Sequence, residues 1–233
     1  MNLRKEDIDK LFEDVRDALA TVEANLPTIV DGFVLSDKTK RPFKAIWFRE
    51  SACWRIAQLS RSSLECFEKR KLASAVLLAR ACMETSASLW YLRQILERSI
   101  EAQTIGDADE RIMQLLMGSK VDPNLQKAVN VLKCIDCVDK TIPGFRHQYD
   151  NLSEFAHPNW AGTVLLFSKR EDGGIANFGD NMRSEESVLV AGLHNLAVAL
   201  DVFALSYNRV GELLPDFVRL CEANPQVKDD EGG

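Results

Sequence analysis

The stretch FRHQYDNLSEFAHP at 145–158 holds the densest set of residues that could do chemistry. If it is helical, Arg146, Ser153 and His157 lie on one stripe and Glu154 flanks it. A histidine at a helix C-terminus is stabilised when protonated. Beside an arginine and a carboxylate it could serve acid–base or phosphate chemistry. The alternative is a solvated polar face, or polar groups that tie the helix end to the next element.

Arg80 and Glu84 are four residues apart in the otherwise apolar and small-residue stretch SAVLLARACMETSASLW. We expect both to be partly buried, and buried charge needs a partner. Arginine before glutamate is the poorer order for a helix pair, so Arg80 is expected to pair across helices with Glu154. Together with His157, these residues are predicted to converge in space. The alternative is an ion pair that only fixes the register of the helices.

His194 and Asp201 are seven residues apart and share one helix face, an arrangement typical of a base or a metal ligand. A lone histidine on an apolar helix more often finds a partner in the core, and this is what we expect of His194. The chain has three histidines and neither HExxH nor paired ExxH motifs. We therefore expect no metal and no cofactor.

Cys134 and Cys137 form a CxxC motif, but it falls inside a predicted helix, whereas redox motifs stand at a helix N-terminus after a strand. Core cysteines are the better interpretation. The N-terminus lacks the apolar stretch of a secretory signal, so the cytoplasm, with reduced thiols, is the expected compartment. GxxxxGK[ST], GxGxxG and GxSxG motifs are absent, so nucleotide-binding loops and nucleophile elbows have no sequence support.

The net charge of −6 argues against non-specific binding of nucleic acid or membranes by the whole surface. Basic residues nevertheless concentrate between Lys38 and Lys71, where Trp47 and Trp54 could stack on bases while the cations hold phosphate. The alternative is that these basic faces balance acidic ones elsewhere in the fold or in a dimer partner.

Apolar residues repeat at helical spacing through most of the chain. Pro158 stops one helix and Pro215 another, and two β-compatible runs, Thr163–Ser168 and Ile175–Phe178, flank a turn with Gly173-Gly174. Ser184 is expected to cap the following helix. The predicted helices span residues 4–25, 42–70, 71–101, 107–118, 124–139, 142–156, 185–213 and, after Pro215, a short segment to 222.

These patterns predict an all-α fold, an up-and-down bundle of about six to seven helices with a small β-hairpin near 163–178. We expect a single helical domain over 1–223 with the hairpin as an insertion at 159–181, and a disordered acidic tail at 224–233. The apolar run Val188–Leu205 is interrupted by three polar residues. It is therefore interpreted as the central helix of the bundle, not as a membrane span.

LLARACMETSASLWYL followed by YDNLSEFAHP resembles bacterial families of unknown function in the HEPN-like all-helical group. In that group an arginine and a polar residue, followed by a histidine on one helix, form an RNA-cleaving site at a dimer interface. The resemblance implies a homodimer in which Arg146-His147 begins the motif and His157 ends it, at a longer spacing than usual. Together with the helix stripe and the convergence predicted above, this gives expected catalytic roles for Arg146, His157 and Glu154, and substrate-binding roles for Arg80, Glu84, Ser153 and His147.

Two functions follow as hypotheses. The first is an RNA-binding protein or metal-independent endoribonuclease acting in stress or phage defence. The second is a non-catalytic dimeric helical interaction module, such as a toxin–antitoxin or defence-system component. The second is favoured if Arg146 and His157 are paired inside one subunit with no adjoining cleft.

Overall fold

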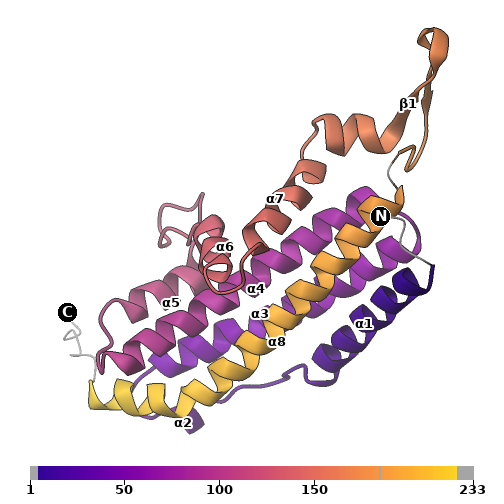
Figure 1. Cartoon of the computed structure of the whole chain (residues 1–233). Coiled ribbons are helices and arrows are strands. Elements are labelled where there is room, and N and C mark those ends of the chain that lie inside the picture. Colours follow the sequence, from indigo (N-terminus) through magenta and orange to yellow (C-terminus); the bar gives the residue numbers. More distant parts are fainter. Residues whose placement is uncertain (1–4, 184, 225–233) are drawn as a thin grey trace.

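The computed structural model describes residues 5–183 and 185–224, which are mainly helical and include one small antiparallel hairpin (Figure 1). The predicted all-α class with a hairpin is thereby confirmed. Ser184, the expected helix cap, and residues 225–233 of the expected tail lie outside the described residues.

Three long helices lie side by side in the body of the molecule: α3 (Arg41–Glu68), α4 (Leu72–Glu101) and α8 (Glu185–Ala223) (Figure 1). The chain reverses between α3 and α4 at Arg70, which has a φ of 55°. Small residues on α4 let α8 approach closely, and the hydroxyl of Ser86 donates a hydrogen bond to the Ala199 carbonyl at 2.7 Å. Helix α1 (Lys5–Ala24) packs on α8 and α3.

Helix α8 continues through Pro215, where the sequence predicted an end. A proline inside a helix removes one backbone hydrogen bond and costs about 3 kcal/mol. Beyond it, Phe217, Leu220 and Cys221 are buried in the core. Burial of such side chains contributes about 1.5–3 kcal/mol each, which offsets the proline.

Three shorter helices cover one side of this body: α5 (Ala108–Met117), α6 (Val131–Asp139) and α7 (Phe145–Ala156). Helix α6 begins later than predicted, because the side chain of Asn130, not Asp122, caps it by accepting a hydrogen bond from the backbone of Leu132. Asp122 instead accepts one from the backbone of Asn124, within the loop that joins α5 to α6.

The hairpin is smaller than predicted. Its strands are β1 (Ser168–Arg170) and β2 (Ala176–Phe178), paired so that Ser168 faces Phe178, with a 3₁₀ turn at Asp172–Gly174. The apolar run assigned to the first strand is instead mostly a π-helix, Trp160–Leu165, whose start is capped by Asn159. Periodicity alone does not separate strand from helix in so short a run. The hairpin projects beyond the ends of the long helices (Figure 1).

Helices α4 and α8 are each long and apolar enough to cross a membrane by length and composition. In each helix, 56% of the most apolar 18-residue stretch is buried inside the fold. Core helices of water-soluble proteins pass the same test, so the absence of membrane association remains a prediction.

Candidate functional site

Tyr149 of α7 connects to two charged residues of α4. Its hydroxyl accepts a hydrogen bond from Nη2 of Arg80 at 2.6 Å and donates one to Oε1 of Glu84 at 2.8 Å. Arg80 and Glu84 also form an ion pair, with 3.2 Å between Nη2 and Oε1. Burial, aided by Glu84 and opposed by Arg80, raises the pKa of the Tyr149 phenol. The three side chains form one charge-balanced cluster at the contact between α4 and α7.

The counter-charge of Arg80 is therefore Glu84 of its own helix, not Glu154 as predicted from the sequence. Glu154 is five residues beyond Tyr149, which places it about 140° further round α7. It is exposed and accepts a hydrogen bond from Nδ2 of Asn159 at 2.8 Å. Of the four residues predicted to converge, Arg80 and Glu84 meet, whereas in the described part of the chain Glu154 and His157 make no hydrogen bond or ion pair with them. Tyr149 of α7 takes the place assigned to Glu154.

Ser153 and His157 follow Tyr149 at successive turns of α7. The hydroxyl of Ser153 donates to the Tyr149 carbonyl at 2.9 Å, so it is engaged by its own helix. His157 caps the C-terminus of α7 through its backbone N–H, and its side chain is exposed. Among the described residues no hydrogen bond or ion pair is made by its imidazole.

Arg146 lies at the opposite end of α7. It binds Asp136 of α6 at 2.6 Å and Asp150 at 3.0 Å, and these two carboxylates raise the pKa of its guanidinium. The ring of neighbouring His147 lies 3.2 Å from the Asn151 amide. Eleven residues separate Arg146 from His157, or about 16 Å along the helix axis. Within one chain, these two side chains do not meet at a single phosphate.

A hollow of about 400 Å³ opens between α3, α4, α5 and the start of α6. Glu84 belongs both to its wall and to the Tyr149 cluster. Arg55 of α3 and Thr85 of α4 supply further polar groups, and Trp47 and Met117 are among the apolar ones. The rest of the lining consists of Phe48, Ser51, Ala52, Ser88, Leu115, Leu116 and Val131.

Arg55 differs from most of its basic neighbours in having no carboxylate partner among the described residues. Lys44 binds Asp109 and Arg61 binds Glu23, at 2.8 and 2.6 Å. Ion pairs also neutralise Lys38, Arg49, Lys69, Arg70 and Lys71. Among the described residues Arg55 makes one hydrogen bond, from Nε to Oγ1 of Thr85 at 3.2 Å, and no ion pair. Most of the basic stretch therefore balances acidic groups of the same chain, and Arg55 remains available.

Trp47 and Ser51 of α3 also line a second, neighbouring hollow of about 260 Å³. The second hollow lies under the segment 27–30, which is held in place because Nε1 of Trp54 donates to the Pro27 carbonyl at 2.7 Å. Apolar side chains crowd this surface and continue onto the short helix α2 (Gly32–Leu35). We call this surface the aromatic face and define it by Ile29, Phe33, Val34, Phe43, Trp47 and Trp54.

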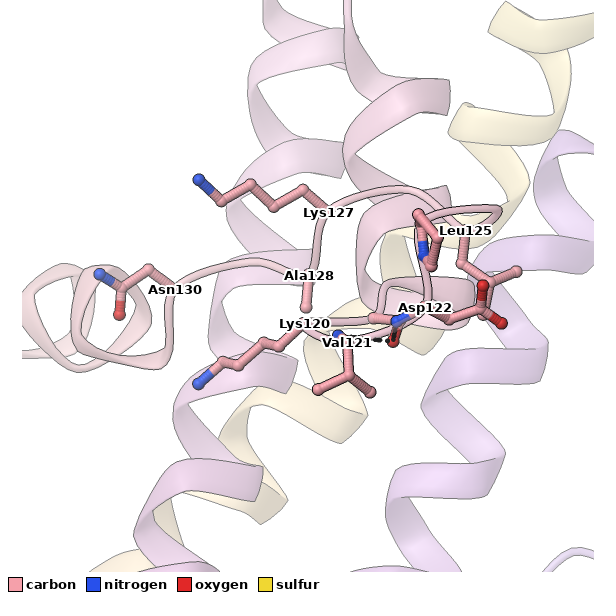
Figure 2. A pocket seen from close by; sticks show the side chains of 9 residues that line it. Lys120, Val121, Asp122, Leu125, Lys127, Ala128 and Asn130 are labelled. Carbon is pink, nitrogen blue, oxygen red and sulfur yellow. Dashed lines mark hydrogen bonds between the residues drawn. The ribbon is translucent and has the colours of Figure 1, made fainter.

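A third hollow, of about 610 Å³, lies in the loop that joins α5 to α6. Figure 2 shows that its walls all come from this loop, with Lys120 and Lys127 reaching out on one side. Val121 is 92% exposed, and no helix supplies a lining side chain. A site built on one exposed loop lacks the rigid walls that hold a ligand in place.

Of the remaining predicted groups, His194 is exposed, so the expectation of a core histidine is wrong. Burial and the nearby Asp14 raise the pKa of Asp201.

Cys134 and Cys137 are buried free thiols of the core, as predicted, and burial raises the pKa of Cys134 to about 12. No group of three or more histidines, cysteines or carboxylates able to hold a metal occurs in residues 5–183 and 185–224.

Sequence reasoning missed two features of this region. The first is the contact of Tyr149 with Arg80 and Glu84, because spacing within one helix does not show which residue of another helix it meets. The second is the exposed apolar segment 29–34. Its Ile-Val and Phe-Val pairs follow no helical repeat, and this is the signal in the sequence that could have indicated an exposed apolar surface.

Comparison of the chain with protein-family models, with curated proteins and with solved structures found no match.

Proposed function

We propose that this protein is a non-catalytic helical interaction module that forms a homodimer through the aromatic face. The observation that carries the proposal is the exposure of Ile29, Phe33 and Val34, which are 85%, 86% and 83% exposed beside two half-exposed tryptophans. A contiguous apolar surface of this kind marks a protein–protein contact. Tryptophan is also enriched among the residues that contribute most to binding.

A second copy of the chain is the occupant that the charges favour. In a two-fold symmetric dimer the same patch meets itself, so an unpaired charge on it would face its own copy. Among the described residues, Glu50 is the one charged side chain that lines the hollow of the aromatic face. It is paired with Arg49 and accepts a hydrogen bond from Tyr207 at 2.6 Å. At the hollow itself, self-association therefore brings no uncompensated like charges together, and the exposed carboxylate of Asp31 on the neighbouring segment accepts a hydrogen bond from the Phe33 backbone.

The placement of Arg146 supports a non-catalytic role. Its guanidinium is engaged by two carboxylates of its own chain, and a phosphate would have to displace them. Its separation from His157 along α7 also leaves the two residues without a common substrate position in one subunit.

Sedimentation equilibrium of Val34→Glu and Val121→Glu at micromolar concentrations tests the proposal. Both valines are exposed, but Val121 is on the loop between α5 and α6, outside the aromatic face. We expect the native chain and Val121→Glu to be dimers and Val34→Glu to be a monomer with unchanged circular dichroism. A monomeric native chain, or a dimer that persists in Val34→Glu, would overturn the proposal.

RNA binding with metal-independent cleavage is the second candidate. The imidazole of His157 favours it, because it is exposed and has no hydrogen-bond or ion-pair partner among the described residues. Incubation of the protein with total RNA in EDTA tests this function. Cleavage by the native chain that is lost in His157→Ala would support an endoribonuclease. If neither form cleaves or binds RNA, this second function is excluded.

A further inference from the structure

We propose that the 400 Å³ hollow between α3, α4 and α5 is a binding site for a small organic anion, a carboxylate or phosphate attached to a planar or apolar body. Arg55 would hold the anionic group, and Trp47 with its apolar neighbours would cover the body. The site adjoins the dimer contact proposed above, because Trp47 and Ser51 line both hollows.

The sign of the ligand charge follows from the balance of charges in the wall. Arg55 and Glu84 are the two charged residues lining the hollow. Glu84 is already compensated by Arg80 and by the hydroxyl of Tyr149. Arg55 has no carboxylate partner among the described residues, and its one hydrogen bond uses Nε, which leaves both terminal nitrogens free. A guanidinium presents these donors in a planar fork that matches carboxylate and phosphate oxygens.

The other lining residues specify a ligand with an apolar part. Trp47 is 49% exposed and Met117 is 42% exposed, and both contribute to the hollow. An indole offers a flat surface for stacking, and a methionine adapts to irregular shapes. The volume falls within the range of about 300–1,000 Å³ that is typical of small-molecule sites.

The walls of the hollow are fixed before a ligand arrives. They come from α3, α4, α5 and the first residue of α6, whereas the lining residues of the loop hollow in Figure 2 all lie on the loop between α5 and α6. Thr85 donates to the Ala81 carbonyl at 2.8 Å while it accepts from Arg55, so it orients the guanidinium from the rigid side of α4. A preformed site of this kind loses little entropy when the ligand binds.

Isothermal titration calorimetry with two anionic probes tests the proposal. Adenosine monophosphate and indole-3-acetate present a phosphate and a carboxylate on planar rings, and adenosine and indole are their uncharged counterparts. We expect at least one anion to bind about tenfold or more tightly than its uncharged counterpart, since hydrogen bonds to charged groups contribute this much. Binding of only the phosphate or only the carboxylate identifies the group that the site prefers, and binding of neither at millimolar concentration overturns the proposal.

Arg55→Gln and Arg61→Gln form a matched pair for locating the site. Arg61 is on the same helix but pairs with Glu23 outside the hollow. Affinity should fall about tenfold or more in Arg55→Gln and stay unchanged in Arg61→Gln. Equal affinity in both variants would overturn the assignment.

Fluorescence provides a second test that does not use an arginine variant. The ligand should quench tryptophan emission, and Trp47→Phe should lose most of that quenching. Trp160→Phe removes another exposed indole, on the π-helix remote in sequence from the hollow, and should keep it. Quenching that survives in Trp47→Phe but disappears in Trp160→Phe would place the ligand elsewhere and contradict the proposal.

Discussion

The hydroxyl of Tyr149 donates a hydrogen bond to the carboxylate of Glu84 at 2.8 Å, across the contact between α7 and α4. The same oxygen accepts a hydrogen bond from Arg80. One phenol therefore forms hydrogen bonds with two charged groups that the apolar surroundings of α4 partly exclude from water.

Tyr149→Phe tests the contribution of this hydroxyl to stability. We expect the free energy of unfolding to fall by about 1–2 kcal/mol, because two hydrogen bonds to charged groups are lost while Arg80 and Glu84 still contact one another. Ser153→Ala is the control, since its hydroxyl bonds only to the carbonyl of Tyr149 on its own helix. Urea denaturation measures both, and equal effects of the two substitutions would contradict a special role for Tyr149.

Gly192→Ala should destabilise the contact of α8 with α3. A Cβ at this position would come within 2.4 Å of the buried Phe67 ring, and overpacking of a core costs about 1–3 kcal/mol. Gly211→Ala on the same helix is a matched control. Its Cβ would meet only the Arg49 side chain at 3.1 Å, and alanine is the better helix former by about 1 kcal/mol. Thermal unfolding should show Gly192→Ala below the native chain and Gly211→Ala at or above it.

Asp201→Asn should raise stability at pH 7. Burial and Asp14 raise the pKa of Asp201, so the folded state binds this proton more tightly than the unfolded chain does. The free energy of unfolding therefore falls as pH rises through the range between the unfolded and folded pKa values. The amide removes this penalty, and the gain should vanish below about pH 3, where the carboxyl is protonated in both states. Asp17→Asn, on the exposed side of α1, controls for the change in net charge; an equal gain there would contradict the explanation.

Buried cysteines should resist alkylation in the native protein. Burial raises the pKa of Cys53 to about 11 and of Cys82 and Cys221 to about 12, and only the thiolate is reactive. Cys66 is the one cysteine among the six that is not fully buried. Mass spectrometry after brief treatment with iodoacetamide at pH 7.5 should find label on Cys66 first. Rapid labelling of Cys82 in the folded protein would contradict the burial.

The sequence by itself determined the helical class and the course of the long helices. Apolar residues at steps of three and four define α1, α3 and α4 to within two residues of the observed ends, because the helical repeat is a local property. The same reasoning assigned Cys134 and Cys137 to the core. It ended α8 too early, since the local cost of Pro215 is visible in the sequence, whereas the core contacts that offset it are not.

Only the tertiary structure decided which polar residues meet. Arg80 and Glu84 could be identified as charges needing partners, but Tyr149 became that partner through the way α7 lies against α4. The basic stretch at 38–71 likewise became mostly ion-paired, whereas Arg55, the cation that lines the 400 Å³ hollow, has no carboxylate partner among the described residues. Pairing depends on contacts between residues far apart in the chain, and these contacts are set by packing of whole helices, not by the spacing of residues within one of them.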